Sequence, residues 1–76
     1  MITGKQIKAA RKLLGWSAAT LAIKSNRTAI GAARAEDGML VGKHVESSLQ
    51  KIQAAFEAAG IEFVADTVKL RQNDVV

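Results

Sequence analysis

Few side chains of the 76-residue chain could perform catalysis or bind a metal. His44 is the only histidine and there is no cysteine, so a thiolate site is excluded and His44 has no His or Cys partner for metal ligation. Ser47 and Ser48 follow it, but no lysine or histidine stands at a triad-like spacing to activate a serine nucleophile. The sequence therefore predicts no enzyme, no cofactor and no metal site, and His44 is interpreted as a surface or helix-capping residue.

The clearest chemical signal is an uneven distribution of charge. Residues 1–35 contain seven basic side chains and no acidic one, whereas residues 36–76 contain four basic and seven acidic ones, which gives the net charge of +4. A cationic half of this kind attracts a polyanion or an acidic protein. Lysine and arginine are also common on ordinary solvated helix faces, which is the alternative interpretation.

The elements that carry these charges are expected to be mainly helical. The length allows one domain, and a composition of 49% apolar but only 4% aromatic residues predicts a core of Ala, Leu, Ile and Val. No apolar run reaches the roughly 18 residues that span a bilayer, and the N-terminus lacks a signal-peptide pattern. We therefore expect a soluble, cytoplasmic protein without a membrane partner.

Capping signals predict three short helices in the N-terminal half. Each helix follows a serine or threonine whose hydroxyl can cap the first turn, and Gln6 completes a capping box in the first helix. The predicted helices cover residues 4–14, 18–24 and about 29–37, after the cap residues Thr3, Ser17 and Thr28, with Gly15 and Gly38 as the ends of the first and third. Three short helices joined by tight turns make a helix-turn-helix arrangement plausible.

A fourth helix and a small β-hairpin are predicted in the C-terminal half. The helix is indicated by four apolar residues at helical spacing, with Gly60 as a left-handed cap: Val45, Leu49, Ile52 and Phe56. Beyond Gly60 a first strand is indicated because Ile61, Phe63 and Ala65 alternate with Glu62, Val64 and Asp66. Residues 68–71 can return as a second strand around a turn at Asp66–Thr67. Residues 72–76 are interpreted as a frayed tail, which leaves one domain over residues 1–71.

The segment MITGKQIKAARKLLGWSAATLAIKS resembles the N-terminal half of the xenobiotic-response-element (XRE) family of lambda-repressor-like helix-turn-helix regulators. Glu36 and Gly38 match the Glu-x-Gly at the end of that family's recognition helix, and AAFEAAGIEF looks like the end of a small single-domain branch. The resemblance covers most of the chain and implies a four-helix domain with a C-terminal hairpin. It also implies a structural brace between Arg11 and Glu36, for which a bidentate guanidinium is suited.

The resemblance places the recognition helix at TAIGAARAEDG, where the sequence departs from a DNA-reading pattern. The positions that usually reach base edges are Thr28, Ala29, Ile30, Ala33 and Arg34. Only Thr28 and Arg34 keep a side chain that can form hydrogen bonds, and direct readout of bases depends on such groups. Sequence-specific DNA binding is therefore poorly supported.

Further departures concern phosphate binding and the core. Ala18 stands where the family often has a phosphate-binding glutamine, and Arg27 occupies a position that is usually apolar and buried. Ala32 and Ala35 stand where larger aliphatic residues usually anchor the recognition helix. Each lost side-chain volume costs about 2–5 kcal/mol if it is left as a cavity, so either neighbouring elements close in or the recognition helix is loosely held.

Two functions follow from these observations. One is a DNA-binding transcriptional regulator of the repressor type, which uses the basic half for phosphate contacts. The other is a protein-binding regulator in which the apolar former reading face docks on another protein. The chain is also similar to small antiactivators that bind and block transcriptional activators of conjugative-element transfer, so an activator protein is the preferred partner.

The predicted partner-binding residues are the same for either function: Lys24, Arg27, Thr28, Ala29, Ile30, Ala33 and Arg34. The alternative is that the alanines are simply good helix formers at solvent positions, which does not account for Ile30. The sequence is compatible with a monomer or a weak homodimer.

Overall fold

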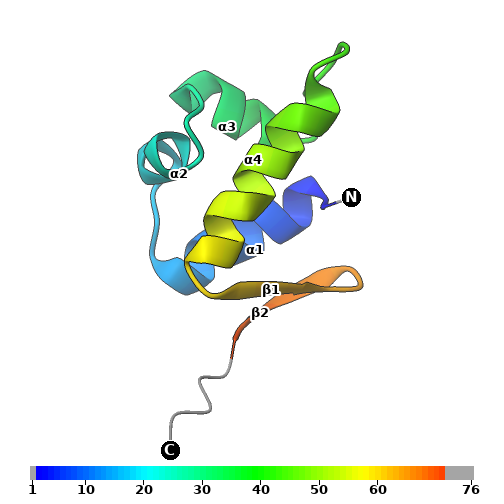
Figure 1. The fold of residues 1–76 in the computed structure, drawn as a ribbon. Coiled ribbons are helices and arrows are strands. Elements are labelled where there is room, and N and C mark those ends of the chain that lie inside the picture. The colour runs from blue at the N-terminus through cyan, green and yellow to red at the C-terminus, as the bar shows by residue number, and fades with distance from the viewer. Residues whose placement is uncertain (1, 72–76) are drawn as a thin grey trace, which may run out of the picture.

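A computed structural model describes residues 2–71 of the chain (Figure 1). Its elements, in order, are α1 (Gly4–Leu14), α2 (Ala18–Lys24), α3 (Ala29–Glu36), α4 (Val45–Ala58), β1 (Ile61–Val64) and β2 (Thr67–Leu70). The predicted mainly helical fold with a small C-terminal antiparallel hairpin is confirmed. The tail predicted at residues 72–76 lies outside the described residues.

The helices begin at the predicted caps. In α1 the Thr3 hydroxyl accepts from the Gln6 amide at 3.2 Å and Gln6 Oε1 accepts from the Thr3 amide at 2.9 Å, so the capping box is complete. The Ser17 hydroxyl caps α2 by accepting from the Thr20 amide at 3.1 Å. Gly15 ends α1 in the left-handed conformation, with φ of 67°, which a residue with a side chain rarely adopts.

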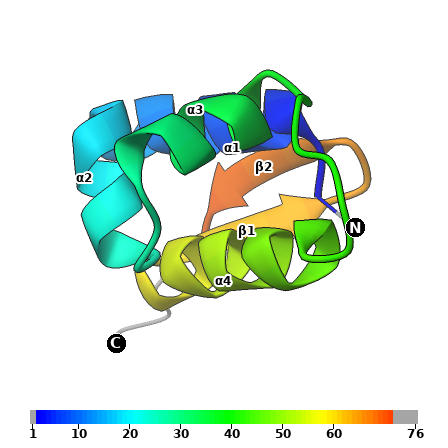
Figure 2. The ribbon, with the colours of Figure 1, turned by 90° about the horizontal axis from the view of Figure 1, so that it is seen from above.

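The hairpin lies beneath α1 and α4, and α2 and α3 pack together on the side of the molecule away from it (Figures 1 and 2). Contacts between elements place α1 over β2 and α4 over β1. α3 contacts both α1 and α2. This arrangement leaves one side of α3 facing solvent and keeps it well separated from the hairpin.

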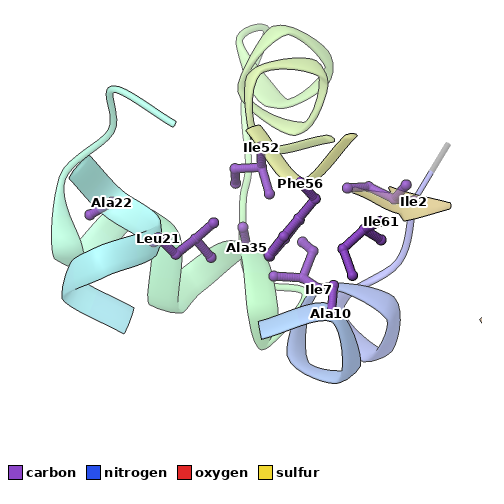
Figure 3. Close-up of a cluster of buried hydrophobic side chains, with 10 residues drawn as sticks. Ile2, Ile7, Ala10, Leu21, Ala22, Ala35, Ile52, Phe56 and Ile61 are labelled. Atoms are coloured by element: carbon purple, nitrogen blue, oxygen red, sulfur yellow. The ribbon is translucent and has the colours of Figure 1, made fainter. Parts of the chain in front are cut away.

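The core is formed where α4 faces α1, α2 and β1 (Figure 3). Its largest fully buried side chains are Phe56, Ile7, Leu21, Ile52 and Ile61. On α4 the predicted apolar stripe is confirmed, since Ile52 and Phe56 are buried and Val45 and Leu49 are half-buried.

Trp16 anchors the joint between α1 and α2, as its half-buried position shows. Its indole stacks on the Phe56 ring with centroids 5.4 Å apart, and Phe56 in turn meets Phe63 edge-on at 6.1 Å. Three aromatic side chains therefore link the α1–α2 turn, α4 and the hairpin. Aromatic pairs of this geometry stabilise a core by about 0.5–1.5 kcal/mol beyond the area that they bury.

The small residues of α3 are accommodated by a close approach of α1. Ala32 and Ala35 are buried, as their core-facing positions predict. Gly4 in the first turn of α1 lies so close to α3 that a Cβ there would collide with the carbonyl oxygen of Glu36. The approach does not fill all of the space, because a hollow of about 200 Å³ remains beside Ala35, Leu40 and Leu49.

The hairpin turn lies one residue earlier than the sequence pattern predicted. Val64 pairs with Thr67, so the turn residues are Ala65 and Asp66, and Ala65 is an exposed turn residue with φ of 51° instead of an inward strand residue. The buried Gln6 side chain donates from Nε2 to the carbonyl oxygens of Ala65 at 2.9 Å and Thr67 at 3.1 Å. This contact from α1 supports a turn that lacks the Asn-Gly or Asp-Gly signal of tight hairpins.

The predicted brace between Arg11 and Glu36 is confirmed. Arg11 donates from Nε to Glu36 Oε2 at 2.9 Å and from Nη2 to Oε1 at 2.7 Å, and its Nη1 donates to the Trp16 carbonyl oxygen at 3.1 Å. The hydrogen bond to Glu36 raises the pKa of the Arg11 guanidinium; burial opposes the rise and the charge of Glu36 adds to it. One guanidinium therefore joins α1, the α1–α2 turn and the end of α3.

Arg11→Ala is expected to destabilise the protein by about 1.5–3 kcal/mol, because it leaves the partly buried Glu36 carboxylate without its charged hydrogen-bond donors. Urea unfolding followed by circular dichroism measures the change. Lys51→Ala, at an exposed position of α4, is the control and should cost less than about 0.5 kcal/mol. Equal costs for the two variants would show that the brace contributes nothing.

Gly4→Ala is expected to lower the free energy of unfolding by at least about 1 kcal/mol, although alanine is the better helix former by roughly that amount. The reason is that the new methyl group forces the first turn of α1 away from the Glu36 carbonyl. The control is Lys5→Ala at the next residue of α1, which is exposed, so that the substitution tests helix propensity alone. A Gly4→Ala protein as stable as the parent would contradict the close approach of α1 and α3.

Candidate functional site

The residues predicted to bind a partner lie mainly on the outer face of α3. Helical periodicity turns Ala32 and Ala35 into the core, and it therefore turns Ala29, Ile30 and Ala33 toward solvent. Ile30 is the one large apolar side chain of this face and is 65% exposed. Most of this aliphatic side chain is therefore left in contact with solvent by residues 2–71.

Basic side chains border the apolar face. Lys24, at the end of α2, and Arg34, in the last turn of α3, are exposed, whereas Arg27 in the turn between these helices is half-buried. The salt bridges within residues 2–71 are Arg11–Glu36 and Lys69–Glu62, so the three border cations have no carboxylate partner in that part of the chain. Their charge is available to a partner.

Thr28 is an exposed residue that also stabilises the first turn of α3. Its Oγ1 accepts a hydrogen bond from the Gly31 amide at 3.0 Å and caps the helix. Of the two side chains on the predicted reading face that can form hydrogen bonds, only Arg34 extends freely from the helix body. Of the seven predicted residues, Lys24 and Arg27 precede α3, so Arg34 is the one long hydrogen-bond donor on α3 itself.

Three exposed apolar residues near α3 escaped prediction from the sequence. Ile23 on α2 is 79% exposed, and Met39 and Val41 in the loop after α3 are 63% and 88% exposed. The start of the loop is attached to the end of α3, because the Met39 amide donates to the Arg34 carbonyl oxygen at 2.7 Å. The signal in the sequence was the apolar run Met39-Leu40-Val41 between two glycines, where a solvated loop would normally be polar.

We call these residues of α2, α3 and the two adjoining loops together the α3 surface: Ile23, Lys24, Arg27, Thr28, Ala29, Ile30, Ala33, Arg34, Met39 and Val41. It holds four of the seven large apolar side chains that are exposed within residues 2–71. Exposed apolar groups of this size that are bordered by charges are typical of protein-binding surfaces.

The remaining candidates for chemistry do not converge on a site in the described part of the chain. His44 is exposed and its side chain makes no capping hydrogen bond to α4. Within residues 2–71 no three side chains of His, Cys, Asp or Glu come together as metal ligands. None of the helices there is both long enough and apolar enough to cross a membrane.

No protein-family model matches the chain, and no curated protein is detectably similar to it. What the chain binds is therefore inferred from the α3 surface.

Thr28→Ala is expected to cost about 1 kcal/mol of stability because it removes the cap of α3. Arg34→Ala on the same helix should change stability by less than about 0.5 kcal/mol, since its side chain is exposed and unpaired in the described chain. Denaturant unfolding of both variants measures the difference. If Thr28→Ala were as stable as Arg34→Ala, the Thr28 hydroxyl would be free for a partner instead of serving the helix.

Proposed function

We propose that the protein is a transcription-regulating helix-turn-helix protein that acts as an antiactivator, binding a transcriptional activator protein through its α3 surface. The observation that carries the proposal is the exposed Ile30 at a position where a DNA reader needs a polar side chain. The neighbouring Ala29 and Ala33 are also exposed and apolar. An activator held on this surface would be kept from its promoter or from RNA polymerase.

The energetics support a protein partner over a nucleic acid. Complete burial of an isoleucine side chain stabilises a complex by about 1.5–3 kcal/mol, and Ile23 and Met39 offer further area of the same kind. Lys24 and Arg34 at the border speed the encounter with an acidic partner and contribute less to its residence time. Exposure of these apolar groups to water contributes no favourable free energy, whereas their burial against a protein partner does.

DNA binding by the same helix is the second candidate, and the exposed cations favour it. Lys24 and Arg34 can contact phosphates. Discrimination among bases, however, depends on bidentate groups such as arginine on guanine or asparagine on adenine. Arg34 is the one such group on α3, so any DNA binding is expected to be weak, dependent on salt and nearly independent of sequence.

Ile30→Asp is expected to weaken binding of the activator by about 10- to 100-fold or more, because the variant loses apolar contact and buries a charge. Activator partners are identified by a two-hybrid screen against transcriptional activators, and affinity is then measured by calorimetry. Val64→Asp, an exposed apolar position on the hairpin, is the matched control and should leave the affinity unchanged. Arg34→Ala should slow association and reduce its dependence on salt.

The opposite ranking of the variants would identify a DNA-binding repressor. In that case the parent protein binds a specific DNA sequence tightly at physiological salt, Arg34→Ala abolishes the binding and Ile30→Ala preserves it. A fluorescence-anisotropy titration of labelled DNA at several salt concentrations distinguishes the two results.

A further inference from the structure

The hairpin lies on the side of the molecule away from α3 (Figure 1), and a second apolar surface lies between its strand β2 and α1. It is a groove of about 390 Å³ between the exposed side of α1 and β2, lined by Ala9, Lys12, Leu13, Thr67 and Val68. Leu13 is 47% exposed and Leu70, further along β2, is 50% exposed. We call it the α1–β2 groove. The proposed function makes no use of it.

The backbone of β2 is open along this groove. β1 is the only strand hydrogen-bonded to β2 in the described chain, and the Arg71 amide donates to the Gly60 carbonyl oxygen at 2.6 Å. Hydrogen-bonded and non-hydrogen-bonded pairs alternate in an antiparallel sheet, so the pairs Ile61–Leu70 and Phe63–Val68 are of the non-hydrogen-bonded kind. The amide and carbonyl groups of Val68 and Leu70 therefore point away from β1.

No backbone hydrogen bond joins Val68 or Leu70 to another element within residues 2–71. An open strand edge beside an apolar groove is the geometry by which an extended peptide adds to a sheet: the backbone supplies the hydrogen bonds and the groove takes alternate side chains. Here Leu13 and Ala9 form the floor for such side chains.

The charges of α1 specify the chemistry of the peptide. Lys5, Lys8 and Lys12 recur at three and four residues along one side of the helix, α1 contains no acidic residue, and the charge of Arg11 is already paired with Glu36. Lys12 lines the groove itself. Of the acids on the hairpin, Glu62 is paired with Lys69 at 3.5 Å, which leaves Asp66 at the turn. The groove is thus bordered by cations along its helix side.

The same charges oppose a second copy of the chain as the occupant. If two β2 strands paired through both Val68 and Leu70, Lys69 of one copy would stand directly opposite Lys69 of the other. Like charges in directly opposed positions destabilise a strand pair. An acidic strand avoids this repulsion and meets the lysines of α1.

We propose that the α1–β2 groove binds an extended acidic segment of a partner protein, which adds to β2 as a third strand. Its backbone pairs with Val68 and Leu70, its apolar side chains contact Leu13 and Ala9, and its carboxylates lie beside Lys8 and Lys12. The site is separate from the α3 surface, so either surface can be occupied alone.

The test titrates the full chain with a capped peptide, Glu-Val-Glu-Val-Glu-Val-Glu, and follows amide NMR shifts and hydrogen exchange. Binding should shift and protect the amides of Val68 and Leu70. Two further peptides are N-methylated on every valine or on every glutamate. Because alternate amides of a strand point to opposite sides, one of these peptides should lose binding and the other should retain it.

Variants locate the binding on the protein. Leu13→Asp and Lys12→Glu should each weaken the peptide by at least about tenfold, while Ile30→Asp on the α3 surface and Lys51→Glu on α4 should change its affinity by less than about twofold. Circular dichroism shows whether Leu13→Asp is folded, and Lys12→Glu gives the answer if it is not.

The proposal is overturned if the two methylated peptides bind equally, if the shifted amides belong to α3, or if no binding is seen below about 1 mM peptide. A protein that sediments as a dimer, and as a monomer after Leu13→Asp, would assign the groove to a second copy instead.

Discussion

The contact between the Arg11 guanidinium and the Glu36 carboxylate holds α3 in place, and the features of the α3 surface depend on it. α3 offers only alanines to the core, so it buries little apolar area of its own. Its position is fixed at one end by the two hydrogen bonds from Arg11 and by the close approach of Gly4 to the Glu36 carbonyl. Helix orientation here is determined by polar geometry and backbone contact more than by side-chain volume.

The two surfaces divide the cations of residues 1–35 between them. Lys24, Arg27 and Arg34 border the α3 surface, while Lys5, Lys8 and Lys12 border the α1–β2 groove. Arg11 serves neither, because its charge is used inside the fold. The basic side chains that are close together in the sequence thus form two separate groups on the folded chain. Each group lies beside exposed aliphatic side chains.

The helices could be predicted closely because their signals are local. Thr3, Ser17 and Thr28 cap the helices that follow them, and each bond spans three residues. The hairpin turn was misplaced because part of its support is not local: Ala65 takes a left-handed conformation beside hydrogen bonds from Gln6, far away in the sequence. Alternation of apolar residues does not contain that information.

Only part of the candidate site could be predicted, because some of its residues depend on packing that the local sequence does not show. The resemblance to a helix-turn-helix family identified Ile30 and Arg34, because it supplied the positions that usually reach base edges. Ile23 and Met39 were missed because exposure in a short helix or a loop depends on which neighbours pack over it. The half-burial of Arg27 agrees with the resemblance, which placed this residue at a position that is usually buried.

Gln6 gives the fold a property that neither of its local roles has alone. Its Oε1 accepts from the Thr3 amide in the first turn of α1, and its Nε2 donates to the carbonyl oxygens of Ala65 and Thr67, which lie 59 and 61 residues further along the chain. When that side chain swings away, the helix start and the hairpin lose a support at the same moment. Gln6 therefore couples the stability of the start of α1 to that of the hairpin turn, so that opening of one is expected to weaken the other.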